Sequence, residues 1–145
     1  MEEKLIQELA AKALAARKHA YAPYSHFCVG AALLCEDGTV FTGCNIENAA
    51  YPVGICAERT AFAKAISEGY RSFTALAIAG AADERSGSDR CSPCGLCRQF
   101  IREFAAPDFP ILVFAADEDG TVTDYTVYSL AQLLPDSFGP DALGR

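Results

Sequence analysis

Apolar residues recur along the first part of the chain with the period of a helix. Between residues 3 and 19 they stand three and four positions apart, with charged residues between them. These apolar positions are Leu5, Ile6, Leu9, Ala10, Ala13 and Leu14. The pattern predicts an amphipathic helix over 3–19, and Pro23 stops it soon afterwards.

Five shorter apolar runs have the length and composition of strands. An Asp-Gly pair at Asp37-Gly38 separates the first two runs, and another at Asp119-Gly120 precedes the last one, so two hairpins are expected. The five expected strands are Phe27–Leu34, Thr39–Asn45, Phe73–Ala79, Ile111–Ala115 and Thr121–Val127.

Three further helices are expected. Residues 57–68 have helical spacing and end at Gly69. A second helix opens at Pro93, and a short one covers Ser129–Leu134. No repeat or long linker divides the chain, so residues 1–145 are expected to form one domain. The order α-β-β-α-β-α-β-β-α predicts an α/β fold, a three-layer sandwich with a five-stranded mixed sheet between helices.

Composition and net charge argue against two classes of protein, those that bind polynucleotides and those that span a membrane. Of the 145 residues 51% are hydrophobic, and twelve Lys and Arg against nineteen Asp and Glu give a net charge of −7. Affinity for polynucleotides comes mainly from basic residues, so no polynucleotide partner is expected. The longest apolar run, Phe27–Cys35, is far shorter than the ~20 residues of a membrane helix. The opening residues Met1–Lys4 begin no apolar signal segment, so we expect a soluble cytoplasmic protein with no membrane partner.

The seven cysteines carry the most chemical information. An odd number in a protein expected in the cytoplasm argues against a disulfide framework. Three of the seven fall within the segment Cys91–Cys97, and the other four are spread singly along the chain. Reduced thiols at such short spacing bind metals or carry out redox chemistry.

Two of the expected helices begin with cysteine. Cys56 precedes one, and Cys94 and Cys97 lie three residues apart at the start of another, where they share a face. The positive end of a helix favours thiolates, and three thiolates suit zinc with a fourth position left for water. Glu58 would then be a carboxylate beside that water, suited to carrying protons.

Two other uses of these cysteines stay open on the residues alone. Cys91 lies three residues before Cys94, so four cysteines could close a structural zinc site, and a CxxC pair can also serve redox chemistry. A structural site has no use for Glu58, however, and Pro93 is expected to leave Cys91 on the loop side of the helix start. The residues therefore favour catalytic zinc over the other two.

Several segments resemble one family. Cys56-Ala-Glu-Arg59 followed by Pro93-Cys-Gly-Leu-Cys-Arg-Gln99 is similar to the signature of the zinc-dependent cytidine deaminases, with Cys as first ligand where other nucleobase deaminases have His. Three more segments, in order along the chain, resemble the small homotetrameric members: Tyr21–Ala32, Gly43–Asn48 and Leu133–Gly139. The resemblance thus covers nearly the whole chain.

The resemblance implies an activity and a cofactor. One Zn²⁺ per chain would be held by Cys56, Cys94 and Cys97, and cytidine and 2′-deoxycytidine would be deaminated to uridine and 2′-deoxyuridine in pyrimidine salvage. Zinc-bound hydroxide would attack C4 of the ring, and Glu58 would shuttle protons to N3 and to the leaving ammonia. Arg59 resembles the family arginine that hydrogen-bonds the thiolates and offsets their excess charge.

The resemblance also implies substrate contacts and an assembly. Asn45 and Glu47 would hydrogen-bond the ribose 3′-hydroxyl, Phe27 would pack against the pyrimidine, and the backbone around Ala57 would contact the nucleoside.

Two further residues, Tyr51 and Phe138, look like those that reach a neighbouring subunit's site. A homotetramer with active sites completed by neighbouring subunits is therefore implied. One alternative is a deaminase of another aminopyrimidine nucleoside, which would differ only in the shape of its pocket. A non-enzymatic domain held together by zinc would instead need four sulfur ligands and would tolerate Glu58→Gln.

Overall fold

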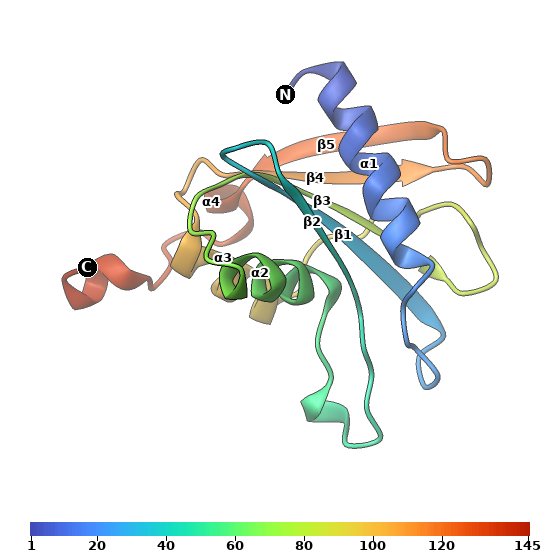
Figure 1. Cartoon of the computed structure of the whole chain (residues 1–145), viewed down its shortest axis with the longest axis horizontal. Helices are drawn as coiled ribbons and strands as arrows, with labels where there is room; N and C mark the ends of the chain where they lie inside the picture. Colours follow the sequence, from blue (N-terminus) through green and yellow to red (C-terminus); the bar gives the residue numbers. More distant parts are fainter.

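The computed structural model describes all residues from Met1 to Arg145, and its five strands form one sheet in the order β2-β1-β3-β4-β5 (Figure 1). The strands are β1 (Phe27–Cys35), β2 (Val40–Cys44), β3 (Phe73–Ala82), β4 (Pro110–Ala116) and β5 (Val122–Ser129). The helices are α1 (Glu3–Arg17), α2 (Ala57–Ser67), α3 (Gly95–Phe104) and α4 (Leu130–Leu133), with 3₁₀ turns η1 (Tyr51–Val53) and η2 (Pro140–Leu143).

The sheet is mixed, as expected from the order of the elements. Strands β3 and β4 are parallel and are joined through α3, whereas β1–β2, β1–β3 and β4–β5 are antiparallel. Both predicted hairpins form. Their turns use Gly38 and Gly120 at φ of +91° and +89°, a left-handed conformation that glycine adopts without steric cost.

Side chains of the central strands alternate between two cores, one on each face of the sheet. In β3, Leu76 and Ile78 belong to the core that contains α2 and α3. The residues between them, Ala75, Ala77 and Ala79, belong to the core that contains α1. Helices therefore cover both faces, and the predicted three-layer arrangement is confirmed.

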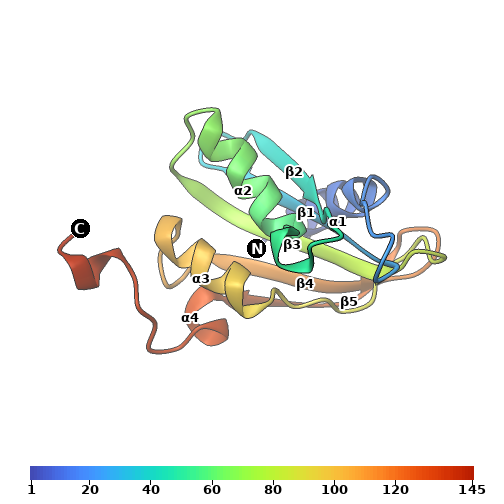
Figure 2. The same ribbon diagram turned by 90° about the horizontal axis from the view of Figure 1, so that it is seen from below.

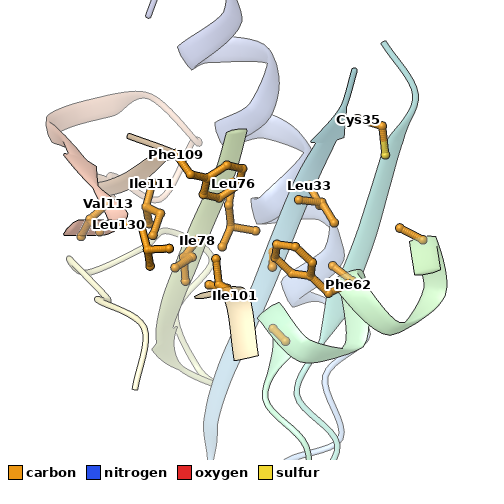
Figure 3. Close-up of a cluster of buried hydrophobic side chains, with 14 residues drawn as sticks. Leu33, Cys35, Phe62, Leu76, Ile78, Ile101, Phe109, Ile111, Val113 and Leu130 are labelled. Carbon is orange, nitrogen blue, oxygen red and sulfur yellow. The ribbon is translucent and has the colours of Figure 1, made fainter. Parts of the chain in front are cut away.

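The core under α2 and α3 is built from large side chains (Figure 3). Phe62 of α2 and Ile101 of α3 are fully buried against strand residues such as Leu33. Full burial of one such side chain contributes about 1.5–3 kcal/mol. This core fixes the two helices relative to each other and to the sheet.

The start of α2 is brought close to β2 by a glycine. A methyl group at Gly43 would lie 2.6 Å from the carbonyl oxygen of Ala57 and 2.5 Å from the amide nitrogen of Ala61. A side chain at this position would push the helix away. The absence of one allows the first turn of α2 to rest on the end of β2.

A buried arginine secures the other end of the sheet. Arg17, at the end of α1, is only 5% exposed. Its guanidinium donates hydrogen bonds of 2.6–2.9 Å to the carbonyl oxygens of Cys28, Ala81, Ala82 and Arg85. It thereby satisfies backbone groups where β1 begins and β3 ends.

Most elements differ from the prediction by one or two residues at an end, and β5 continues to Ser129. Helix α1 ends at Arg17, two residues early, and β3 continues to Ala82 because its last residues pair with the start of β1. Helix α3 begins at Gly95 because Cys94 is extended, with φ −67° and ψ 168°. The single-turn 3₁₀ segments are too short to give a periodic signal. No helix of the chain is long and apolar enough to cross a membrane.

Candidate active site

Three cysteine sulfurs meet where two helices begin. Cys56 is the N-cap of α2, Cys94 is the N-cap of α3, and Cys97 lies in the first turn of α3. The three sulfurs all lie within 4.8 Å of one another, and the Sγ atoms of Cys56 and Cys94 are 3.8 Å apart. The helices lie side by side (Figure 2), so residues 38 positions apart in sequence form one cluster.

The cluster favours at least one thiolate. The pKa of Cys56 is lowered to about 5, first by the hydrogen bond from the Cys97 thiol and then by the one from Arg59. The pKa of Cys97 is raised, first because its proton is held in that same bond to Cys56 and then because of burial. A metal ion bound between these sulfurs would displace the protons of the thiols.

Arg59 lies against the cluster from within α2. Its Nη2 atom is 3.5 Å from the sulfur of Cys56. Its Nε atom is buried and has no hydrogen-bond acceptor in the protein. A guanidinium in this position supplies positive charge next to sulfurs that carry negative charge.

Glu58 is a buried carboxyl group beside the sulfurs. It is 4% exposed and lies in the first turn of α2. Its pKa is raised to about 7, mainly by burial and further by the negative charge on Cys56. A carboxyl group with such a pKa can both accept and release a proton near neutrality.

Cys91 lies outside the sulfur cluster. A methyl group at Gly80 would meet the sulfur of Cys91 at 2.8 Å and a ring carbon of Phe27 at 3.1 Å, so the thiol packs between β3 and the start of β1. Burial raises its pKa to about 12. The structure therefore brings together three sulfurs, as the position of Pro93 predicts, and not the four of a closed site.

A cavity of about 550 Å³ opens next to Cys56. It is bounded by the connection between β2 and α2, by the loop before β1 and by the start of α3. Its lining residues are Tyr24, Ser25, Asn45, Ile46, Glu47, Asn48, Tyr51, Pro52, Gly54, Ile55, Cys56, Arg59 and Leu96. Four of the predicted site residues outside the zinc set and Glu58 thus lie in one hollow with Cys56: Asn45, Glu47, Tyr51 and Arg59.

Asn45 and Glu47 are held firmly at the cavity wall. Asn45 accepts a hydrogen bond from the amide of Val29 and donates one to the carbonyl oxygen of Phe27, both at 2.9 Å. Glu47 accepts bonds from the backbone amides of Tyr24 and Ser25 at 3.0 and 3.1 Å, and from the hydroxyl of Ser25. The sequence pattern does not reveal the contact to residues 24 and 25, because they lie more than twenty positions away in a loop.

Of the other predicted contacts, Phe27 and Ala57 do not line the cavity, whereas Tyr51 lines it with an exposed side chain. Phe27 is partly exposed beside Cys91, and Ala57 is fully buried under the start of α2. Tyr51 is 73% exposed, with its ring 5.5 Å from that of Tyr24. The cavity that Cys56 and Tyr51 both line is the space open to a ligand.

Phe138 lies on the C-terminal segment, which leads away from the sheet in both views (Figure 1 and Figure 2). Its side chain is 61% exposed and is not part of this chain's own cavity. The segment around it is nevertheless fixed. Gln99 donates to the carbonyl oxygen of Phe138 at 3.0 Å, and Arg102 binds Ser137 and Asp141 at 2.9 and 2.7 Å.

The donor set fits zinc. Thiolate sulfurs are soft ligands that zinc accepts in tetrahedral geometry, and three of them leave one position open. Cys56, Cys94 and Cys97 supply that number within a single cluster, with a guanidinium beside it to balance the charge.

Comparison with known proteins agrees with this site. A family model described as "Cytidine and deoxycytidylate deaminase zinc-binding region" matches residues 3–113. A cytidine deaminase of Sporosarcina psychrophila is 49% identical over 138 residues, which cover 95% of this chain and 94% of that protein. The chain belongs to the cytidine deaminase family. The family description and the cysteine cluster together suggest a zinc site.

Solved structures of cytidine deaminases have the same fold. The one from Burkholderia pseudomallei is 42% identical, with a TM-score of 0.77, and covers 95% of this chain and 100% of its own. The one from Mycobacterium tuberculosis is 36% identical, with a TM-score of 0.72, and covers 91% and 95%. The resemblance seen in the sequence and the expected cytidine deaminase fold are both confirmed.

Proposed function

We propose that the chain catalyses the hydrolytic deamination of cytidine and 2′-deoxycytidine to uridine and 2′-deoxyuridine, with release of ammonia. The observation that carries this proposal is the placement of a buried carboxyl group, Glu58, beside three clustered sulfurs, one of which, that of Cys56, borders a cavity of about 550 Å³. Membership in the cytidine deaminase family supports the same reaction.

One zinc ion per chain would be held by Cys56, Cys94 and Cys97. When bound, it supplies a water molecule whose pKa is lowered toward ~7, so that a nucleophile is present at neutral pH. Three thiolates leave one excess negative charge on the site, and the guanidinium of Arg59 next to Cys56 offsets it.

Glu58 would carry the protons of the reaction. It accepts one from the attacking water and delivers it to N3 of the pyrimidine, which makes C4 more electrophilic. A bond from oxygen to C4 forms, and Glu58 then delivers the second proton to the amine as the C4–N bond breaks. Both water protons are thereby accounted for, one on N3 of the uridine and one on the ammonia. A pKa near 7 suits both transfers.

The nucleoside would bind with its ribose on Asn45 and Glu47 and its base toward the sulfurs. Both side chains are oriented by hydrogen bonds at the cavity wall and can face the 3′-hydroxyl. Phe27 would pack against the pyrimidine, and the backbone around Ala57 would complete the contact.

The active form would be a homotetramer. Tyr51 and Phe138 are large, exposed side chains on segments that are held in place, and such residues commonly mark contacts between subunits. We infer that they complete the sites of neighbouring chains. We further propose a cytoplasmic location, which the requirement for reduced thiols supports, and a role in pyrimidine salvage.

The absorbance change on conversion of cytidine to uridine tests the proposal. The chain loaded with one zinc should turn over both cytidine and 2′-deoxycytidine and release one ammonia per nucleoside. Removal of the metal by a chelator should abolish turnover, and added zinc should restore it. A folded, zinc-loaded chain that deaminates neither nucleoside would overturn the proposal.

A further inference from the structure

The loop before β1 lies at the cavity wall, next to Asn45 and Glu47, which have proposed roles in binding the ribose. The amide of Tyr21 donates to the carbonyl oxygen of Asn45 at 2.9 Å, and the amide of Glu47 donates back to the carbonyl oxygen of Tyr21 at 2.8 Å. The loop is therefore fastened to the segment that carries Asn45 and Glu47. It continues through Ser25 to Phe27.

Ser25 makes three contacts within this arrangement. Its hydroxyl donates to Oε2 of Glu47, and its backbone amide donates to Oε1 of the same carboxylate at 3.1 Å. Its hydroxyl oxygen also accepts a hydrogen bond from the amide of Phe27 at 3.0 Å. A single side chain thus connects the carboxylate at the ribose end of the cavity to the first residue of β1.

These contacts determine how many acceptor positions of Glu47 are free to bind a ligand. A carboxylate offers about four acceptor positions, and Ser25 with the amide of Tyr24 occupies three. The same bonds lower the pKa of Glu47, the hydroxyl of Ser25 being the largest cause. The carboxylate of Glu47 is therefore a fixed anion with one acceptor position left. Ser25 and Glu47 both line the cavity.

The residue after Ser25 holds the loop from the other side. His26 has a φ of +58°, which is uncommon for a side chain other than glycine. Its amide donates to Ala22 at 3.0 Å, its carbonyl oxygen accepts from the amide of Asp83 at 2.8 Å, and its ring lies 3.0 Å from the carboxylate of Asp83. The loop that carries Ser25 is therefore hydrogen-bonded to other segments on both sides of Ser25, which fixes Ser25 next to Glu47.

We propose that Ser25 is a positioning residue that aims the free acceptor position of Glu47 at the 3′-hydroxyl of the substrate. This inference rests on the proposed deamination of cytidine. It predicts a defect greatest for substrates with a 3′-hydroxyl, because Glu47 is the only side chain that the hydroxyl of Ser25 binds, its other partner being the backbone amide of Phe27.

Kinetics with two nucleosides test the role of Ser25. Cytidine and 3′-deoxycytidine are compared for wild type and Ser25→Ala, with zinc content and circular dichroism measured on each. We expect kcat/KM for cytidine to fall about tenfold, the size expected when a hydrogen bond to a charged group is lost. The value for 3′-deoxycytidine should change by less than about twofold, since Glu47 then has no hydroxyl to bind. Ser25→Thr, which keeps the hydroxyl, should restore cytidine turnover.

Ser86 provides a matched control. It binds a glutamate in the same manner, with its amide and hydroxyl on Glu118 at 2.8 and 2.9 Å, but it lies outside the cavity. Ser86→Ala should leave both substrates unchanged. Should Ser25→Ala fold poorly, Ser25→Cys, a weaker donor, must give the same selective loss.

Two results would overturn the role of Ser25: an equal loss for both nucleosides, or no loss for cytidine. A wild-type chain that deaminates neither nucleoside is a different outcome. It would reject the proposed function, and the role of Ser25 would fall with it.

Discussion

The Nη2 atom of Arg59 lies 3.5 Å from the sulfur of Cys56, one turn earlier in the same helix. The pair joins a cationic group to a thiolate at the positive end of α2. Because Arg59 belongs to the helix that begins after Cys56, its positive charge lies next to the cluster.

Replacement of Arg59 by Gln should separate metal binding from catalysis. The sulfurs remain, so zinc should stay at one per chain. The excess negative charge is no longer offset, and kcat should fall roughly 10–100-fold, as is typical when a group that supports a metal ligand is lost. Zinc analysis together with cytidine kinetics measures both quantities. Unchanged turnover would remove Arg59 from the mechanism, and Arg59→Lys should recover part of the activity because it keeps the charge.

The composition of the metal site gives a second prediction. X-ray absorption at the zinc edge should report three sulfurs and one lighter atom, because Cys91 lies outside the cluster. Cys91→Val should leave this spectrum and cytidine turnover unchanged, whereas Cys97→Ala should lose the metal. Four sulfurs in the wild type, or loss of zinc in Cys91→Val, would instead indicate a closed structural site.

The C-terminal segment gives a third prediction. Arg102 holds Ser137 and Asp141 on either side of Phe138, so Arg102→Ala should release the segment. Faster hydrogen exchange in residues 135–145 should accompany a rise in KM for cytidine of about tenfold, as for loss of a charged hydrogen bond. Phe138→Ala should raise KM similarly without the change in exchange.

Arg90 serves as the control for this prediction. It binds Asp124 of β5 at 3.0 Å and makes no hydrogen bond to residues 135–145. Arg90→Ala should alter neither exchange in residues 135–145 nor KM. An Arg102→Ala chain with wild-type KM would mean that the segment does not contribute to the site.

Much of the fold could be predicted from the sequence because its signals are local. The helical spacing before Arg17 and the Asp-Gly turns at Gly38 and Gly120 are read from neighbouring residues, and the structure has those elements. The sulfur cluster could also be anticipated, since Cys56 and Cys94 each stand at a helix start. Hydrophobic periodicity and helix starts are properties of short windows.

Contacts made by loops and side chains between distant segments could not be predicted in this way. Ser25 meets Glu47 through a loop without periodicity, and Arg102 meets Ser137 across 35 positions. Arginine is a residue type that usually lies at the surface. Arg17 is nevertheless buried, because its guanidinium donates hydrogen bonds to four carbonyl oxygens. Each of these depends on which segments the completed sheet brings together.

Glu58 is the residue on which the proposed reaction depends most directly. Glu58→Gln keeps the size and polarity of the side chain but cannot take up the proton of water. The most direct measurement is cytidine turnover by Glu58→Gln with one zinc per chain and a wild-type circular dichroism spectrum. Our account predicts that kcat falls by at least about 10²–10⁴-fold, the contribution of a general acid–base group. Turnover close to that of wild type would contradict it.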